Sequence, residues 1–565
     1  MKSNGLANCP ALGTDNVVIL FTLSRSAIFW PFWSIIAYPF TGSVLLRAVL
    51  PRFGSSMGKK VFDNNGILKT CGSNIFLFIS RAGRASLLGL VLSLFAVSVA
   101  SAQNPNFVAS KKANEVPVFD AVYPEDEFCA TAGVGGLCAA EPVDVPEFDA
   151  NFIYRFVAYE AQRPFDRFSW QAMVSLVWPY DGDGNPIDAG YRHPDAGRAW
   201  WETYRDKYSL FAGASAPDDQ CRKDLPDGSL LLSAFVQASG DVLIDQAGNF
   251  VLYETRVNDI AADYIRWNGL DSAAGRMAFA QSGQSVAFPI LKLSAGAGAP
   301  SLENANLLAS DKTAFKPGAQ MIKFAWRIMT DPADQERYYT KPARIAVAAK
   351  DAIDGRAKCL DVTVGMLGLH IVQRVKSGNG DRWIWSTFEH VDNAPLASNA
   401  RRPNSIIAND LFPDGCLGPD KTDRDYVFYD GVERADHLAN QIVQSDLRWA
   451  DEPPYARDPD GNRVTAPDIV RCWRLFSGTA EANFVWQRKL GDSVWKNYFL
   501  VGTQWIGNGG GAPFGVGEVP RFLSNVALES FIQHQMDGTC LGCHSTAFTD
   551  AGQPSNFTFL LDPGR

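Results

Sequence analysis

The chain has 565 residues, of which 46% are hydrophobic and 20% are charged, so it is long enough to bury the apolar cores of several domains. Its formal net charge of -9 and its isoelectric point near 5.3 argue against a nucleic acid or an anionic membrane surface as partner. The 15 Trp and 36 Phe are numerous, and we expect most of them to pack in aromatic cores.

A secretory signal pattern occupies residues 81–102. A basic stretch at Arg81–Arg84 precedes a short apolar run, Leu87–Val99, and an A-x-A cleavage site at Ala100–Ala102. The apolar run is too short to span a membrane. The sequence therefore predicts an exported bacterial protein, periplasmic or secreted, whose mature chain begins at Gln103.

This signal lies further from Met1 than signals usually do, so Met57 is an alternative true start, and residues 1–102 form an N-terminal extension that ends in the signal peptide. A competing interpretation makes Val17–Phe40 a membrane anchor. That stretch contains Arg25 and two Pro, which disfavour it, and we expect no stable membrane anchor after cleavage of the signal.

Export changes the expected state of the cysteines. Eight remain in the mature chain: Cys129, Cys138, Cys221, Cys359, Cys416, Cys472, Cys540 and Cys543. Six lie outside a C-x-x-C-H motif near the end of the chain, and in an oxidising compartment they predict up to three disulfides. Cys129 and Cys138 flank a Gly-rich loop and form the favoured pair, whereas the sequence leaves the other four unassigned. A soft-metal site is disfavoured, because no further C-x-x-C exists.

In chain order, residues 103–150 read as an extended segment rich in Pro, Ala and acidic residues, and residues 151–520 read as one large α+β domain. Aromatic and helical patterns dominate Asn151–Arg205. Strand-like runs follow, and they are Asp241–Ile244, Asn249–Arg256, Met321–Met329, Leu360–Val375, Trp383–His390 and Tyr498–Trp505.

The predicted fold class is a mixed α+β arrangement with substantial antiparallel β-sheet, because hairpins rather than β-α-β alternation dominate the pattern. Leu360–Val375 and Trp383–His390 form the strongest hairpin candidate. Helices are expected at Asp436–Arg448 and at Ser524–Gln535, and the second one leads into a short helical haem-attachment segment within residues 521–565, packed on the large domain.

The motif Cys540-Leu541-Gly542-Cys543-His544 carries the clearest chemistry of the chain. Two thiols one helical turn apart can add to the two vinyl groups of haem, and the adjacent imidazole then faces the iron, so C-x-x-C-H is typical of c-type haem attachment. A thioredoxin-like redox pair is the alternative, but it needs a β-α-β context that the short tail cannot supply. The sequence predicts one covalent haem c, with Cys540, Cys543 and His544 as its binding residues and His544 as the proximal iron ligand.

The distal iron ligand must come from upstream, or the sixth position is open. Only 21 residues follow His544, and they contain no Met, His or Lys. If the 360–390 hairpin turns about Asn379, positions 370 and 388 are opposite, and His370 and His390 share one face diagonally. His390 or His370 is therefore the candidate distal ligand, with Met366 as a further upstream candidate. A structural role for either histidine remains the alternative.

Several short stretches, taken together, match one family. They are Phe168–Gln171 with Trp178-Pro179, Tyr253–Arg256, Gly368–His370, Trp385–Asn393, Asn497-Tyr498 with Gly502–Trp505, and Cys540–His544. With them the chain resembles large bacterial cytochrome c family proteins that end in a lone haem motif and have no defined reaction. The resemblance covers roughly residues 150–565 and implies haem binding and periplasmic electron transfer, with no known substrate.

Three functions follow from these observations. The first is a periplasmic electron-transfer protein, whose partner is a redox protein or a small-molecule electron donor or acceptor. The second is a haem enzyme, for example a peroxidase or small-molecule oxidoreductase with an open sixth position, and the third is a non-catalytic haem sensor. Whether the protein is an enzyme is left open by the sequence, and the spin state of the iron separates the first function from the other two.

Overall fold

The computed structural model describes residues 137–142, 158–211, 219–290, 318–377, 380–402, 415–419, 422, 424–431, 438–442, 446–505, 522–533 and 539–562, together with four strands near the N-terminus. The chain divides into two compact units, Met1–Asn114 and Glu115–Arg565.

The first unit contains two described antiparallel pairs. These are β1 (Ser34–Phe40) with β2 (Ser43–Val49), and β3 (Lys60–Phe62) with β4 (Leu68–Thr70). The C-terminal part of the stretch weighed as a membrane anchor, Val17–Phe40, is thus strand β1. The signal pattern at 81–102 lies outside the described residues. Within the described part of the chain, no helix has the length and hydropathy needed to cross a membrane.

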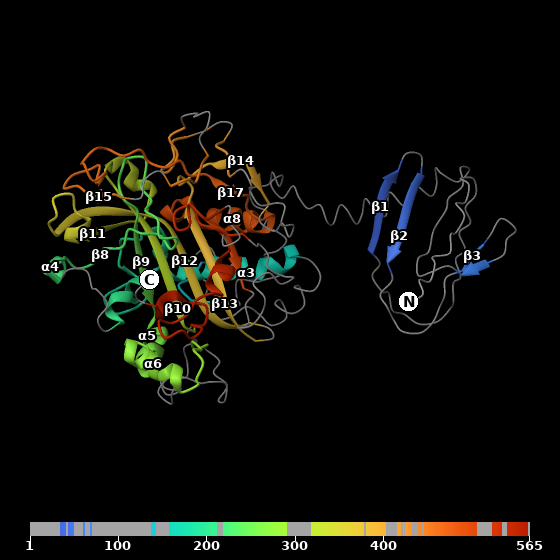
Figure 1. Cartoon of the computed structure of the whole chain (residues 1–565), viewed down its shortest axis with the longest axis horizontal. Helices are drawn as coiled ribbons and strands as arrows, with labels where there is room; N and C mark the ends of the chain where they lie inside the picture. The colour runs from blue at the N-terminus through green and yellow to red at the C-terminus, as the bar shows by residue number, and fades with distance from the viewer. Residues whose placement is uncertain are drawn as a thin grey trace, which may run out of the picture. The chain divides into compact units, whose positions relative to one another are not determined.

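An eight-stranded sheet forms the centre of the second unit (Figure 1). Its strands are β7 (Arg205–Asp206), β8 (Leu230–Leu232), β9 (Leu252–Val257), β10 (Gln320–Ile328), β11 (Thr340–Val347), β12 (Lys358–Ser377), β13 (Gly380–His390) and β18 (Tyr498–Gln504). The order is β18-β13-β12-β10-β9-β7, and β11 pairs with β12 and with β8. The β11–β8 pair is parallel and the other pairs of this sheet are antiparallel.

The remaining elements are short or cover the sheet. The α-helices are α3 (Ala158–Leu176), α4 (Asp219–Arg222), α5 (Asp259–Trp267), α6 (Ala273–Gln281), α8 (Ser477–Leu490) and α9 (Cys540–His544). The small strand pairs are β5 (Pro179–Tyr180) with β6 (Arg198–Ala199), β14 (Leu396–Arg401) with β17 (Arg471–Trp473), and β15 (Arg448–Trp449) with β16 (Ala456–Arg457). The predicted α+β class with substantial antiparallel sheet is confirmed.

Two predicted helices are wrong where the structure describes them. In the segment Asp436–Arg448, Ala439 bridges to Cys416, and Arg448 begins strand β15. Within the predicted helix Ser524–Gln535, residues 524–525 have no regular structure and residues 526–533 form turns and a bend. In this second segment polar side chains bind backbone groups, as where Asn525 Oδ1 accepts a hydrogen bond from Ala527 N at 2.9 Å, and such local bonds compete with the helical pattern.

The predicted hairpin is confirmed, but its register is not. Ser377 pairs with Gly380, and His370 lies opposite Thr387, one residue away from the expected partner. Because successive side chains of a strand alternate between the two faces, this shift places His390 on the opposite face from His370. The prediction that these two histidines share a face is wrong.

The two faces of the sheet have different coverings. On one, called here the helix face, apolar side chains of β10 and β12 such as Ile322 and Leu369 pack in one core with residues of α3 and α8. On the other, called here the C-terminal face, Met321 and Val372 pack with Leu541 of α9. Strands β9, β10, β12 and β13 run side by side through the second unit (Figure 1), so this face brings distant parts of the chain together.

Candidate haem-attachment site

The two cysteines of helix α9 are not in a disulfide. Cys540 and Cys543 are partly buried thiols, and three positions of an α-helix amount to nearly one turn, which puts both sulfurs on the same side. The helix starts after Thr539, whose carbonyl accepts a hydrogen bond from Cys543 N at 3.0 Å. Burial raises the pKa of the Cys540 thiol well above its usual value, so this sulfur is protonated in the free polypeptide.

The other described cysteines are oxidised. Two disulfides join Cys221 to Cys359 and Cys416 to Cys472. Cys138 is also disulfide-bonded, and its expected partner Cys129 lies outside the described residues. Among the described cysteines, therefore, the two of the C-x-x-C-H motif stand apart as thiols.

His544 has one ring nitrogen occupied and one available. The ring Nδ1 lies 2.9 Å from the carbonyl oxygen of Phe557, and because a carbonyl only accepts, Nδ1 carries the proton. Nε2 is then left with its lone pair, the form in which an imidazole binds a metal. Burial lowers the pKa of His544 to about 4, so the ring is neutral at neutral pH.

A strained turn supplies the carbonyl that orients His544. Asn556 and Phe557 both adopt left-handed backbone conformations, with φ of 54° and 66°. For a bulky residue such as Phe this is unusual and costs about 1–3 kcal/mol. Asn556 Oδ1 accepts hydrogen bonds from Trp383 Nε1 at 3.2 Å and from Phe288 N at 3.3 Å, which hold the turn in place. Sequence reasoning missed Phe557, because a backbone acceptor leaves no mark in the residue types.

Aromatic rings enclose the His544 imidazole. The ring centroid of Trp385 lies 4.1 Å away and that of Phe559 lies 5.0 Å away. Trp385 belongs to β13, so the iron-binding candidate is placed directly on the C-terminal face of the sheet. Leu541 N also donates to Gln504 Oε1 of β18 at 3.1 Å, which fixes α9 on this face.

An ion pair between a buried arginine and an exposed aspartate ties the segment after His544 to α6. Arg276 and Asp550 form a bidentate pair, with Nε and Oδ1 2.6 Å apart, and the Arg276 side chain is 4% exposed. The guanidinium holds the pKa of the Asp550 carboxyl below its usual value. This contact anchors the loop that follows His544, and bidentate pairs of this kind fix orientation as well as distance.

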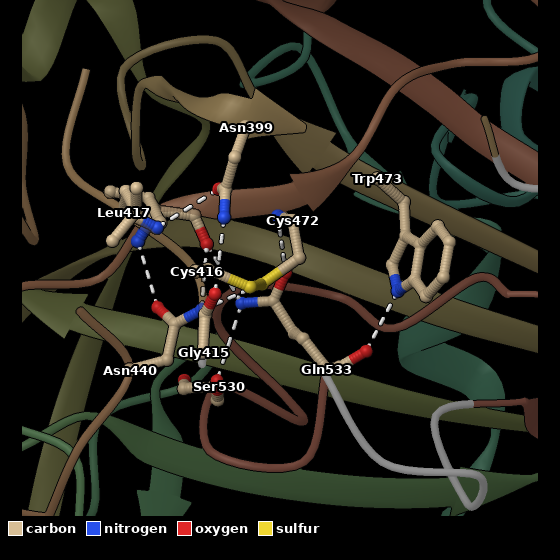
Figure 2. Close-up of a disulfide and its surroundings, with 10 residues drawn as sticks. Asn399, Gly415, Cys416, Leu417, Asn440, Cys472, Trp473, Ser530 and Gln533 are labelled. Atoms are coloured by element: carbon tan, nitrogen blue, oxygen red, sulfur yellow. Dashed lines mark hydrogen bonds between the residues drawn. A yellow bond between two sulfur atoms is a disulfide. The ribbon is translucent and has the colours of Figure 1, made fainter. Parts of the chain in front are cut away.

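The segment 522–533, which precedes the motif, is anchored at the Cys416–Cys472 disulfide (Figure 2). Gln533 accepts a hydrogen bond from Cys472 N through Oε1 at 3.2 Å, and its carbonyl accepts one from Trp473 Nε1 at 2.7 Å. Because the disulfide and Gln533 are buried, the chain is fixed in position at Gln533, six residues before Thr539. His534 and Met536 belong to residues 534–538, which the structure does not describe.

A row of polar side chains crosses the C-terminal face between segment 522–533 and helix α9. This polar row consists of Thr255 of β9, Lys323 of β10, His370 of β12 and Thr387 of β13, which are paired neighbours in register. Segment 522–533 contacts one side of the row, where Asn525 Nδ2 donates to Thr387 Oγ1 at 3.1 Å. Helix α9 lies over the other side, through its contacts with Trp385 and Gln504.

His370 is paired with a carboxylate. Its Nε2 lies 2.8 Å from Glu529 Oε1, and Glu529 Oε2 accepts a hydrogen bond from Asn525 N at 3.0 Å. Burial raises the pKa of the Glu529 carboxyl, but His370 and Lys323 outweigh burial, so the pKa lies below its usual value. His370 and Glu529 also act electrostatically on the His544 ring, which places the pair near the candidate iron site.

His390 does not belong to this site. Its side chain is fully buried, Nε2 donates to the carbonyl of Arg337 at 2.9 Å, and Nδ1 accepts from Asp392 N at 3.2 Å. Both ring nitrogens are therefore occupied, and the ring stacks on Tyr338 with centroids 3.9 Å apart. Met366 packs in the core of the helix face. Of the upstream candidates, only His370 shares a face with α9.

The residues present fit a covalent haem. Two reduced thiols, one neutral imidazole with a free Nε2 and a backbone acceptor behind it are the donor set that c-type attachment requires. In the described part of the chain, no three side chains among His, Cys, Asp and Glu converge to hold a bare metal ion. Comparisons with family models, with curated proteins and with solved structures returned no match to this chain.

Proposed function

We propose that this protein is an exported c-type cytochrome that binds one haem through Cys540 and Cys543 and transfers electrons in the periplasm. One observation carries the proposal: the two described cysteines that are outside disulfides lie one turn apart on α9, next to an imidazole that the Phe557 carbonyl orients. The disulfides elsewhere in the chain are compatible with an oxidising compartment.

The haem supplies an iron that cycles between two oxidation states. The chain holds His544 in a single tautomer and orientation, because Nδ1–H is bonded to a carbonyl on a rigid turn. The rings of Trp385 and Phe559 contact the His544 imidazole, and Leu541 of α9 is buried in an apolar cluster against which Cys540 packs. The residues around His544 would then need little reorganisation when the oxidation state of the iron changes.

For the sixth iron position we propose His370. Its Nε2 is bonded to Glu529, which leaves Nδ1 as the nitrogen able to bind iron, and metal-bound imidazoles commonly donate their other N–H to a carboxylate. His390, the other sequence candidate, has no free nitrogen.

The same pair supports a second candidate function. A carboxylate-bonded imidazole beside an open iron position is able to exchange protons with a bound small molecule, as a haem-dependent oxidoreductase requires. In that case His370 stays unligated. The two functions differ in the spin state of the iron.

The test is to express the full chain in a bacterium competent in haem attachment and to measure the mass and visible spectrum of the exported protein. We expect one covalent haem in the wild type and none in the double variant C540S/C543S. The H370A variant should change a low-spin spectrum into a high-spin one, whereas H390N should leave the spectrum unchanged.

Each outcome is decisive. A colourless wild type with the bare polypeptide mass contradicts haem attachment itself. A coloured wild type that is already high-spin and binds carbon monoxide contradicts His370 ligation and favours the oxidoreductase or sensor. The variant C221S/C359S is the matched control, because it also removes two cysteines but should retain the haem.

A further inference from the structure

Lys323 is a cation without a direct ion pair in the described part of the chain. It lies at the centre of the polar row, and its ammonium makes no hydrogen bond with the residues that the structure describes. Its Nζ lies 5.4 Å from the centroid of the Tyr253 ring. The side chain is partly buried, and burial lowers the pKa of its ammonium. A desolvated ammonium without a counter-charge costs stability, so a buried Lys is normally paired.

The neighbouring carboxylate makes no direct bond to Lys323. Glu529 acts on Lys323 electrostatically, but its hydrogen bonds go to other groups, Oε1 to His370 and Oε2 to Asn525 N. Across the sheet, the neighbours of Lys323 are Thr255 and His370, neither of which is an acid. Among the described residues, therefore, no carboxylate forms a direct ion pair with the Lys323 ammonium.

The Lys323 ammonium lies beside the C-x-x-C-H motif. Lys323 interacts electrostatically with Cys543, and Met321, two residues earlier on the same face of β10, shares an apolar cluster with Cys540 and Leu541. The group that α9 would carry therefore lies within the electrostatic reach of the ammonium.

A second donor without a partner lies on the same face. Trp385 Nε1 is buried and has no hydrogen bond, although its ring contacts His544. Three other buried indoles also lack a partner, namely Trp201, Trp326 and Trp495. Those three pack in the aromatic core of the helix face, away from α9, whereas Trp385 is next to the candidate iron ligand.

We propose that Lys323 and the indole N–H of Trp385 bind the carboxylates of the haem propionates. This inference rests on the proposed haem attachment. The two propionates are the only anionic groups at the edge of a haem, and an ammonium and a neutral N–H are suited to one carboxylate each. A small carboxylate from solution has the same chemistry, and the test separates the two sources.

The experiment compares haem-loaded wild type with K323M, K323Q, K323R and W385F. The reduction potential is measured from pH 5 to pH 9, and the propionate bending band is recorded by resonance Raman spectroscopy. We expect K323M and K323Q to lower the potential, because an unneutralised propionate stabilises the oxidised iron, and to shift the bending band. K323R should retain most of the wild-type potential, and W385F should shift the band by a smaller amount.

K350M is the matched control, since it also removes a lysine charge but at a side chain that is 83% exposed. It should change neither readout. The proposal is overturned if K323M and K323Q keep the wild-type potential and bending band. It is also overturned if added acetate changes the potential of the wild type but not that of K323M, while the propionate bending band stays constant, because Lys323 then binds a carboxylate from solution. A colourless wild type overturns the haem attachment instead, and so the two failures are distinguishable.

Discussion

The two faces of the central sheet differ in what they bury. On the helix face, Trp170 of α3 is fully buried, stacks on Trp486 of α8 at 5.9 Å and meets the edge of Phe388 of β13. On the C-terminal face, a lysine and a histidine with its carboxylate lie between two segments that are fixed by local anchors. The helix face also buries a carboxylate, that of Asp166 in α3, but its oxygens accept hydrogen bonds from three side chains, those of Gln162, Thr479 and Thr503. On the C-terminal face, the ammonium of Lys323 has no such direct bond within the described residues.

This difference has a physical consequence for mutations. Removing a ring from a close-packed apolar core leaves a cavity and destabilises the whole domain. Removing one anchor from the C-terminal face loosens the segment that this anchor holds, so that a local change precedes global unfolding. Stability and haem chemistry should therefore respond to different residues.

The largest effect is expected from Trp170→Ala. The change removes a fully buried indole and its hydrogen bond to Asn483 Oδ1 at 3.0 Å, and should lower the free energy of unfolding by about 3–5 kcal/mol. Denaturant unfolding measures this loss, and Trp170→Phe should lose less. The haem spectrum of the folded fraction should not change; a shifted spectrum would break the separation between the two faces.

A smaller effect is expected from Asp550→Asn. It leaves the Arg276 guanidinium buried without its charged partner, which should cost about 1–3 kcal/mol. Hydrogen exchange should increase chiefly within residues 539–562. Asp562→Asn, which changes the charge of the same segment without removing an ion pair in the described structure, is the control. An equal increase in hydrogen exchange across the whole sheet would show that the Arg276–Asp550 pair is not a local anchor.

The smallest effect at neutral pH is expected from His390→Asn, about 1–2 kcal/mol from its two hydrogen bonds. Burial lowers the pKa of His390 from 6.5 to about 4, so between these values the unfolded chain binds a proton that the folded protein does not. The stability that neutral His390 provides is therefore present above pH 6.5 and is lost as the pH falls toward 4.

Unfolding of wild type and His390→Asn at several pH values measures this. The stability difference between them should shrink as the pH falls through that window. A constant difference from pH 7 to pH 4 would show that His390 does not titrate as its burial requires. An altered visible spectrum in this variant would contradict the exclusion of His390 as an iron ligand.

Local patterns in the sequence predicted the long strands, but the predicted strand Asp241–Ile244 is wrong, because that stretch forms only isolated bridges. The β-branched and aromatic runs at 360–375 and 383–390 became β12 and β13, and the run from Met321 became β10. A change of one residue in the length of the connection shifts the register between β12 and β13, and the alternation of side chains along a strand does not determine that length. The predicted helix at 524–535 was wrong because the bonds of Asn525 and Gln533 to distant backbone groups outweigh a local helical pattern.

The sequence by itself determined the chemistry of the candidate site, because the spacing of Cys540, Cys543 and His544 places two thiols and an imidazole on one helical turn whatever surrounds them. Only the tertiary structure decided which groups complete it. The Phe557 carbonyl, the Glu529 carboxylate and the Lys323 ammonium reach the site through strand register and through contacts between residues far apart in the chain. Such contacts depend on how the faces of the sheet are covered, and no local pattern encodes that.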